Sequence, residues 1–491
     1  MDVPWGPAAN IPAGSPRGLI RGSDVGTAEG MPPRQLRVLD PAEGTLVGEL
    51  DCADENDVRS AVQQAREAAA GWGRTAPGER AALVRQAADA VAAEAEKLAR
   101  WTTREMGKPI GDAAGGVDAG VSTLRQYAEL GPLHRGSSLQ GGWGATDFMH
   151  PEPRGVVAAI TPWNDPVAVP CGLIGAALVT GNAVVLKPSE RTPHTGLKLV
   201  QIMNGVLPPG VLTVVTGDGE TGAALASSPD VDVVAHVGST ATGRAIAQAA
   251  AATGAKVLLE NGGNDPLIVD ADVDPVWAAE QAATGAFANA GQICTSVERI
   301  YVVEAVAEPF LAALVRRAES LTMGAGTDDD TELGPLVDDR MRAAVHAHVE
   351  AAVAGGARLL TGGEIPDRPG TFYPATVLTG CTGDMAVMRE ETFGPVAPVQ
   401  VVESFDAALK EASSGDYGLA AVVLTASTEH AQRAWRELKV GTVKINAAFG
   451  GAPGGAAQPR GMSGQGFGYG PELLDEMTAT KVVHWEPAPQ R

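Results

Sequence analysis

Cysteine is scarce in this chain, with four in 491 residues: Cys52, Cys171, Cys294 and Cys381. These positions are too far apart for a zinc motif and too few for a disulfide scaffold, so we expect no metal site. The first residues also lack a basic segment followed by an apolar core, which is the pattern of a secretory signal. Few cysteines and no such signal together predict a protein of the reducing cytoplasm.

Positively charged residues are also few: the chain has 37 Lys and Arg and 59 Asp and Glu, which gives a formal net charge of −22. Binding to nucleic acid requires clustered Lys and Arg that neutralise phosphates, so nucleic acid is not an expected partner. One stretch, residues 167–186, carries no charge over the length of a membrane span. It contains Pro170 and Gly172, and "TGN" (180–182) is typical of a turn. The stretch therefore predicts a buried helix, a turn and a buried strand, and no membrane association.

The rest of the chain shows two alternations of strand and helix patterns. Residues 1 to about 35 are rich in Gly, Pro and Ala and predict a loose leader. Apolar residues three and four apart predict amphipathic helices over 53–72 and 79–101. Short apolar runs then alternate with helical segments from residue 155, and again after Cys294. This pattern predicts βαβ units and parallel sheets, so the fold class is α/β with two successive α/β domains.

The segment "HVGSTATGRAI" (236–246) follows an expected strand and opens an expected helix. Gly238 and Gly243 would allow a tight turn, and Ser239 could donate to a phosphate at the helix N-terminus. Because the spacing is not the usual G-x-G-x-x-G, a plain turn with an N-cap explains the segment equally well.

Five short motifs make a stronger case because they occur together: "ITPWNDP" (160–166), "NAVVLKPSE" (182–190), "LLENGG" (258–263), "GQICTS" (291–296) and "EETFGPV" (390–396). In this order they closely resemble the NAD(P)-dependent aldehyde dehydrogenase superfamily. The resemblance runs from about "VLDPAEG" (38–44) to "TKVV" (480–483). It favours the hydrolytic, non-CoA-acylating branch, because Glu260 precedes Cys294 at the spacing of those members.

The resemblance implies an aldehyde dehydrogenase-like architecture with three parts. A Rossmann-like, NAD-binding domain would comprise residues 1–129 and 152–260, and an α/β catalytic domain residues 261–457. A β oligomerisation arm would comprise residues 130–151 and 458–491. Bare strands of such an arm seldom stay exposed, so we expect a homodimer or homotetramer.

Thiol chemistry explains the residues that the resemblance marks as catalytic. A Cys294 thiolate would attack an aldehyde carbonyl, and Cys is the side chain best suited to that attack at neutral pH. The family analogy assigns the stabilising donors for the oxyanion to the Asn164 amide and the Cys294 backbone N–H. Glu260 would activate the water that hydrolyses the thioester. The expected activity is therefore NAD-dependent oxidation of an aldehyde to a carboxylic acid.

The same resemblance implies cofactor-binding positions for NAD, with NADP less suited. Lys187 and Glu190 would hold the adenosine ribose, and the Glu190 carboxylate would repel a 2′-phosphate. Glu391 and Phe393 would hold the nicotinamide ribose and flank the ring, although Phe393 alone would suggest core packing. The remaining expected cofactor positions are Trp163, Gly238 and Ser239.

The chain departs from the family pattern at four positions that often carry bulky aromatic residues: Asp165, Gly172, Ala288 and Ala457. The resemblance places these positions, with Thr295, in the substrate tunnel. A wide, polar tunnel for a polar or bulky aldehyde is therefore expected.

Asp165 has two interpretations. It could pair with a nearby Arg or cap a helix that begins at Pro166. Alternatively it could face a cationic or hydroxyl-bearing aldehyde, in which case an anionic semialdehyde would suit the site least. Asn261 and Asn264 replace the usual Leu and Lys beside the base and could shift the pKa or the rotamer of Glu260.

Two further functions compete with aldehyde oxidation to an acid. A CoA-acylating relative would transfer the acyl group to a thiol, but such relatives tend to lack the base that Glu260 supplies. A catalytically silent member with a structural or binding role is the second alternative. Retention of Cys294, Asn164, Lys187 and Glu391 argues against it.

Overall fold

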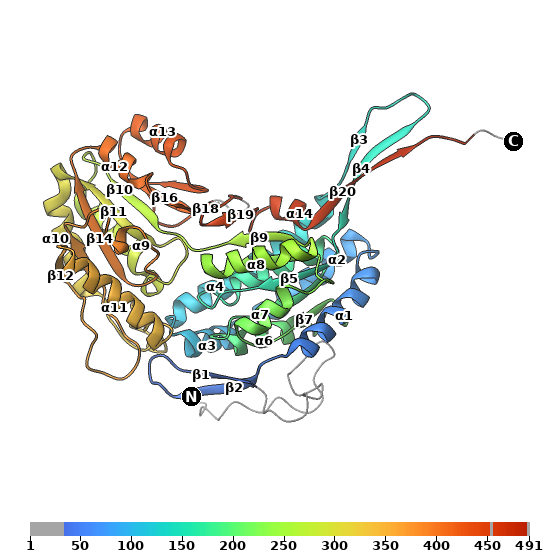
Figure 1. The fold of residues 1–491 in the computed structure, drawn as a ribbon, viewed down its shortest axis with the longest axis horizontal. Coiled ribbons are helices and arrows are strands. Elements are labelled where there is room, and N and C mark those ends of the chain that lie inside the picture. Colours follow the sequence, from blue (N-terminus) through green and yellow to red (C-terminus); the bar gives the residue numbers. More distant parts are fainter. Residues whose placement is uncertain (1–33, 452–454, 489–491) are drawn as a thin grey trace.

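The computed structural model describes residues 34–451 and 455–488, so the predicted leader lies almost entirely outside the described residues. Two large sheets lie side by side with helices packed against them, and a narrow arm of strands projects from one end (Figure 1). Apart from one edge strand in each, both large sheets are parallel. The prediction of an α/β fold with parallel sheets is confirmed.

The first large sheet has six strands in the order β19-β9-β8-β5-β6-β7. Its strands are β5 (Val156–Ile160), β6 (Ala183–Lys187), β7 (Leu212–Val214), β8 (Val233–Val237), β9 (Lys256–Glu260) and β19 (Gly464–Gln465). Its connecting helices are α5 (Ala168–Val179), α6 (Pro193–Met203), α7 (Gly219–Ala226) and α8 (Thr240–Thr253). Residues of β5 and β6 are buried on both faces, which explains their continuous apolar runs. The uncharged stretch 167–186 forms α5, a turn and β6, as predicted.

Four helices precede this sheet: α1 (Glu55–Trp72), α2 (Pro77–Ala93), α3 (Ala95–Met106) and α4 (Ile110–Leu130). The helix expected over 79–101 is in fact two helices, because the chain turns at Glu94 (φ −110°, ψ 16°). Neither Gly nor Pro marks this break, and the apolar spacing continues through it, so the pattern gave no signal.

The second large sheet has seven strands in the order β12-β13-β14-β11-β10-β16-β17. Its strands are β10 (Asp265–Val269), β11 (Val297–Val303), β12 (Arg358–Thr361), β13 (Thr376–Thr379), β14 (Val396–Val402), β16 (Ala420–Leu424) and β17 (Thr442–Ile445). Its helices are α9 (Pro275–Phe287), α10 (Glu304–Ser320), α11 (Asp339–Ala354), α12 (Phe405–Ala412) and α13 (Thr428–Glu437).

Smaller elements complete the described fold. They are the hairpin β1 (Gln35–Leu39) and β2 (Leu46–Asp51), the pair β15 (Tyr417–Gly418) and β18 (Arg460–Gly461), α14 (Glu472–Glu476), and the short 3₁₀ turns η1 (Gly131–Leu133), η2 (Ala288–Gly291) and η3 (Ala386–Met388). No helix among residues 34–451 and 455–488 is long and apolar enough to cross a membrane.

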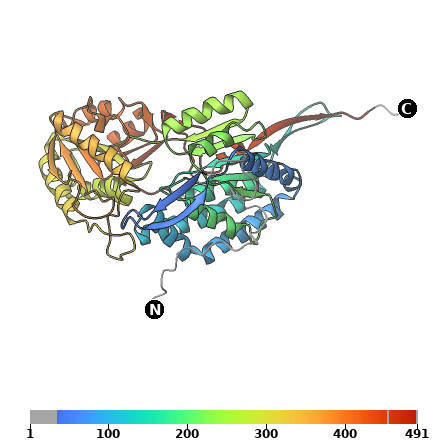
Figure 2. The ribbon, with the colours of Figure 1, turned by 60° about the horizontal axis from the view of Figure 1, so that its bottom comes forward.

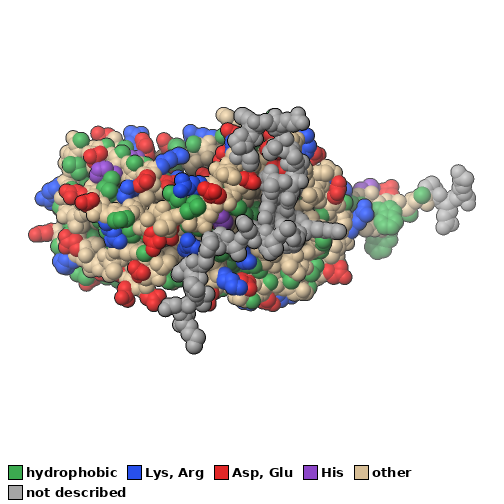
Figure 3. All heavy atoms as spheres, turned by 90° about the horizontal axis from the view of Figure 1, so that it is seen from below, with side chains coloured by type: hydrophobic (Ala, Val, Ile, Leu, Met, Phe, Trp, Pro, Cys, Tyr) green, Lys and Arg blue, Asp and Glu red, His purple; other side chains and the backbone are tan. Residues whose placement is uncertain are grey.

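The projecting arm is a three-stranded antiparallel sheet in the order β20-β4-β3 (Figures 1 and 2). Its strands are β3 (Ser137–Leu139), β4 (Thr146–Pro153) and β20 (Thr478–Trp485). Trp143, Val482 and Trp485 are exposed on it, and hydrophobic side chains gather on the arm in Figure 3. The arm therefore presents an apolar surface away from the body of the molecule.

The chain passes from one large sheet to the other over very few residues. Strand β9 ends at Glu260 and β10 begins at Asp265, so the intervening turn bridges the two sheets. The late strand β19 returns to pair with β9, with Gly464 opposite Glu260. Segments far apart in the sequence thus meet at this bridge.

Candidate active site

The carboxyl ends of the parallel strands β8, β5 and β6 lie side by side. In the strand register, Ile160 stands opposite both His236 and Lys187, and Val237 stands opposite Glu260. The segments that follow these strands carry most of the predicted motifs. Ligands of open α/β sheets bind at this edge, so the edge is the candidate site.

The turn before Cys294 has an unusual backbone. Asn289 and Ala290 have φ values of +49° and +54°, in the left-handed region that favours glycine. At Gly291 (φ +72°) a Cβ would overlap the Gly394 carbonyl. The Gln292 side chain fastens the turn by accepting from the Val337 N–H at 2.9 Å. Backbone held this firmly in sparsely populated conformations is typical of functional sites.

Asn164 reaches this turn from the other sheet. Its side-chain amide donates to the Gln292 carbonyl at 3.0 Å, two residues before Cys294. The amide has a second N–H, which remains available to an oxyanion beside the thiol. The structure therefore brings the predicted Asn164 and Cys294 together.

Cys294 is partly exposed, and its thiol lies in a strongly acidic environment. Burial raises its pKa to about 12, and the nearby carboxylates of Glu260 and Asp265 act in the same direction. At neutral pH the thiol keeps its proton in this arrangement. A base must therefore remove that proton before Cys294 can attack a carbonyl.

Glu260 stands at the end of β9 with its carboxyl group packed against Gly468. Burial raises the pKa of Glu260 to about 7, and a hydrogen bond from the Gly468 backbone lowers it in part. A Cβ at position 468 would overlap the Glu260 side chain, so any larger residue there would displace the carboxyl group. Our sequence reasoning missed Gly468, although the alternating glycines of "GQGFGYG" (464–470) signal close backbone approach.

Asn261 and Asn264 direct their amides away from the base. Asn261 donates to the Met462 carbonyl at 3.1 Å, and Asn264 donates to the Glu390 carbonyl at 3.1 Å. Within the described chain neither forms a hydrogen bond with Glu260. The suggestion that they shift its pKa thus finds no support in these contacts.

Glu391 and Phe393 lie on a loop that Glu298, a residue we had not singled out, holds in place. The Glu298 carboxylate accepts from the backbone N–H groups of Thr392 and Phe393, each at 2.8 Å. Burial raises the pKa of Glu298 well above its usual range, and the Glu391 charge adds to this. Glu391 itself accepts from the Gly263 N–H at 3.0 Å, which ties the loop to the bridge after Glu260.

Phe393 has a φ of +51° and an edge-to-face contact with Trp163, with ring centroids 5.5 Å apart. The Arg191 guanidinium lies over the Trp163 ring, 5.2 Å from its centroid. A positive φ costs conformational free energy in a non-glycine residue. The loop therefore holds Phe393 beside Trp163 in a strained backbone conformation. The two predicted cofactor positions therefore form one aromatic wall.

The remaining predicted cofactor positions fit a bound dinucleotide. The buried Lys187 ammonium donates to the carbonyls of Pro188 and Gly217, at 2.9 and 2.8 Å, and forms no ion pair within the described residues. Glu190 and Ser239 are exposed, and Ser239 caps α8. At Gly238 a Cβ would come within 2.7 Å of the His236 ring, so glycine keeps this turn open. A buried cation with a free donor and an open helix N-terminus suit ribose hydroxyls and phosphate.

Asp165 has a protein partner, but not the one expected. Its carboxylate lies 3.7 Å from the Lys108 ammonium, which also donates to the Asn164 carbonyl at 3.3 Å. The expected helix start at Pro166 is wrong, because α5 begins at Ala168 and receives no side-chain cap. Asp165 is therefore a paired charge close to Asn164 rather than an N-cap.

An aromatic side chain lies beside Gly172, one of the positions where the sequence predicts tunnel space. A Cβ built there would lie 3.9 Å from the Tyr469 ring, so an aromatic side chain from the C-terminal segment stands beside this position. Ala457 and Thr295 are both partly exposed. The sequence pattern could not show that the Tyr469 ring lies beside Gly172, because the two residues are nearly 300 positions apart along the chain.

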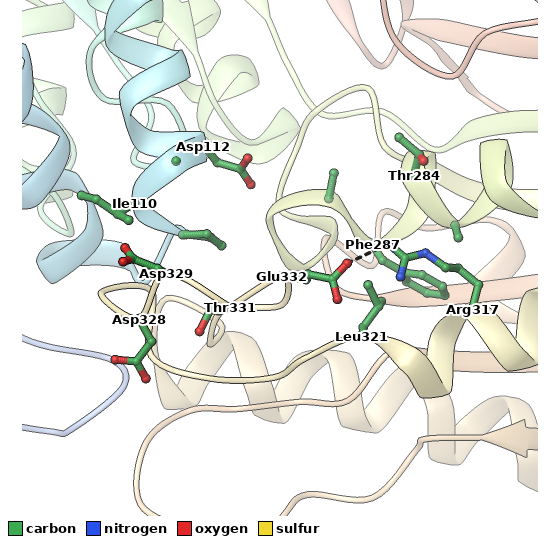
Figure 4. A pocket seen from close by; sticks show the side chains of 14 residues that line it. Ile110, Asp112, Thr284, Phe287, Arg317, Leu321, Asp328, Asp329, Thr331 and Glu332 are labelled. Carbon is green, nitrogen blue, oxygen red and sulfur yellow. Dashed lines mark hydrogen bonds and ion pairs between the residues drawn. The ribbon is translucent and has the colours of Figure 1, made fainter.

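Ala288 borders a cavity of about 340 Å³ between α4, α9 and the loop that follows α10 (Figure 4). Its acidic lining residues are Asp112, Asp328, Asp329 and Glu332. Arg317 also lines it and pairs with Glu332 at 2.9 Å. The small side chain at 288 thus opens onto a polar, predominantly acidic space.

Comparison with known proteins agrees with this geometry. Residues 28–483 match the model of the aldehyde dehydrogenase family. A betaine aldehyde dehydrogenase of Cereibacter sphaeroides is 38% identical over 91% of this chain and 93% of its own length. A mitochondrial succinate-semialdehyde dehydrogenase of Arabidopsis thaliana is 34% identical over 95% of this chain and 88% of its own.

A solved structure extends the likeness to three dimensions. A betaine aldehyde dehydrogenase of Staphylococcus aureus in complex with NAD⁺ superimposes with a TM-score of 0.92 at 31% identity. The match covers 97% of this chain and 96% of that one. Sequence, fold and site geometry therefore agree, and the chain belongs to the aldehyde dehydrogenase family.

Proposed function

We propose that this protein oxidises a polar aldehyde to the carboxylic acid with NAD, through a covalent intermediate on Cys294. The observation that carries the proposal is the meeting of three groups from separate segments. Asn164 is hydrogen-bonded to the Cys294 turn, and the Glu260 charge acts on the Cys294 thiol. A nucleophile, an oxyanion donor and a base with a pKa near 7 together form an acyl-transfer site.

The chain's own residues account for the steps around the carbonyl. Cys294 loses its proton and bonds to the aldehyde carbon, and the free N–H of Asn164 holds the resulting oxyanion. Oxidation of the thiohemiacetal on Cys294 to the thioester requires a hydride acceptor, which bound NAD would supply. Glu260 then takes a proton from water, and the hydroxide releases the acid from the sulfur.

Cofactor residues follow from the same edge of the six-stranded sheet. Lys187 and Glu190 are proposed to hold the adenosine ribose, and Ser239 with Gly238 to receive the diphosphate. Trp163 and Phe393 would flank the nicotinamide, and Glu391 would bind its ribose. The five parallel strands β5 to β9 of the six-stranded sheet would thus form the core of the cofactor domain, which we place within residues 1–129 and 152–260.

The substrate is proposed to be cationic or neutral rather than anionic. Lys108 neutralises Asp165, so the charge beside Asn164 does not by itself select a cation. We propose that the cavity at Ala288 receives the distal end of the aldehyde, where its four carboxylates would disfavour a carboxylate on the substrate. Betaine aldehyde and succinate semialdehyde, the substrates named for the two relatives, represent the two charge classes.

The decisive experiment measures NADH formation by the purified full-length chain with matched cationic, neutral and anionic aldehydes. We expect the highest kcat/KM with the cationic or neutral member, and no dependence on added CoA. Cys294→Ala should abolish turnover while NAD still binds, because the thiol forms the intermediate and does not hold the cofactor. Appreciable turnover by that variant would exclude the covalent route, and a tenfold preference for the anionic aldehyde would exclude the charge argument.

The arm supports a proposal about assembly. Its exposed strands and apolar side chains are suited to pairing with a second copy, so we propose a homodimer or homotetramer. The cytoplasm remains the proposed location.

A further inference from the structure

Tyr469 adjoins the site from the C-terminal segment and has an ordered setting. Its hydroxyl lies 2.8 Å from the Thr123 Oγ1 on α4. Its ring meets Tyr127 edge-to-face, with centroids 6.4 Å apart. Both contacts come from α4, so they hold the ring at a fixed orientation against that helix.

The ring also faces α5. Its Cδ2 and Cε2 atoms lie 3.9 Å from the position of a Cβ at Gly172, which is ordinary van der Waals distance. Despite these contacts, 41% of Tyr469 remains exposed. Packed side chains of this size are usually more deeply buried, so a large part of the ring is free to contact another molecule.

The neighbouring residue connects Tyr469 to the chemistry. Gly468 contacts the Glu260 carboxyl group, and Tyr469 follows it directly in the chain. The ring thus packs against α4 and α5 one residue along the chain from the contact with the proposed base.

We propose that Tyr469 is a specificity-determining residue whose ring forms the aromatic wall of the substrate site beside Gly172. The inference rests on the proposed function and adds to it the group that selects the aldehyde by size and shape. A flat or cationic substrate body gains dispersion and cation–π contact with the exposed ring. A small aliphatic aldehyde does not reach the ring and gains nothing from it.

The first test compares Tyr469→Ala with Tyr469→Phe, using benzaldehyde as the large probe and propanal as the small one. Loss of the ring should lower kcat/KM for benzaldehyde about tenfold, mainly through KM, because one apolar contact typically discriminates by this factor. Propanal should change by less than about threefold. Tyr469→Phe keeps the ring and should keep the preference for benzaldehyde.

The second test exchanges the position of the aromatic ring. Gly172→Trp alone should reduce activity with benzaldehyde, because the indole would compete with Tyr469 for the same space. Combining it with Tyr469→Ala should restore much of that activity, so that the two changes are strongly non-additive. Additive losses would overturn the proposal.

Folding is controlled separately. If Tyr469→Ala does not fold, Tyr469→Leu fills much of the same volume against Tyr127 without a ring face and takes its place. An unchanged ratio of benzaldehyde to propanal in an active ring-less variant would show that Tyr469 only packs. That result differs from failure of the proposed function, in which the unmodified chain would form no NADH with any aldehyde.

Discussion

Burial raises the pKa of both Cys294 and Glu260, yet both groups must be deprotonated in order to act. Cys294 must lose a proton from a thiol whose pKa is about 12, whereas Glu260 must be free of its proton near pH 7. A carboxylate with a pKa near neutrality can accept a proton from water, and in principle from the thiol as well. The order in which Glu260 acts is therefore the main mechanistic question at this scale.

Glu260→Gln tests that order. Turnover of the unmodified enzyme should rise with pH through about 7, because the base works only when deprotonated and is protonated below its pKa. The variant should give a burst of about one NADH per active site, then stall at the thioester and lose the pH step. Rapid-mixing measurement of NADH separates the phases. A missing burst would instead assign Glu260 to deprotonation of Cys294.

Glu190 decides the cofactor preference in our proposal, since its carboxylate is exposed beside the buried Lys187. NAD should therefore be preferred to NADP, and Glu190→Ala should narrow the difference by removing the charge that repels a 2′-phosphate. The ratio of kcat/KM for the two cofactors measures this. Glu129 on α4 is also an exposed glutamate, so Glu129→Ala is the matched control and should leave the ratio unchanged. Equal use of both cofactors by the unmodified chain would refute this role.

At the scale of elements, the sequence predicted what depends on local pattern. The buried strands β5, β6 and β8 were predictable because each is a continuous apolar run in a parallel sheet. The break between α2 and α3 was not, since it has no Gly or Pro and the apolar spacing continues across it.

The site divides in the same way. Cys294, Glu260 and Asn164 lie in recognisable motifs, and the structure brings them together. Gly468 and Tyr469 make contacts across long sequence separations, and Lys108, just before α4, meets Asp165, just before α5. The glycine spacing of 464–470 signals close backbone approach at Gly468 but does not name its partner, and Tyr469 and Lys108 carry no such signal, so the contacts themselves could be found only from the fold.

The turn before Cys294 provides a prediction about stored strain. Ala290 has a φ of +54° and is buried, so glycine should relieve about 1 kcal/mol of backbone strain. Ala290→Gly should therefore leave thermal stability unchanged or raise it, while lowering kcat because the turn holds the thiol less firmly. Ala282→Gly in α9 is the control, where glycine should destabilise by about 1 kcal/mol. Thermal unfolding and NADH kinetics provide the measurements. A clear loss of stability in Ala290→Gly would show that the turn is not strained.

At the scale of the whole molecule, the arm is the feature that favours association with a second chain. We expect a dimer or tetramer by light scattering at micromolar concentration, because exposed strand edges and apolar side chains favour association. Val482→Lys should shift the equilibrium toward smaller species on dilution, since it places a charge among those side chains. Val276→Lys changes an exposed valine on α9 and should have no such effect. A monomeric unmodified chain would contradict the assembly proposal.

The glycines between Ser463 and Pro471 have a consequence for how this protein can vary over evolutionary time. A side chain at Gly464, Gly466, Gly468 or Gly470 would run into neighbouring atoms, whereas Gln465 between them is exposed. Substitutions should therefore accumulate only at the residues between these glycines. At the four glycines themselves, steric overlap rather than chemistry excludes other side chains. The contact of Gly468 with Glu260 and the close approach of β19 to β9 both depend on this glycine spacing. The two features are therefore inherited together. New substrate preferences would have to arise at Tyr469 and its neighbours without altering the glycine spacing.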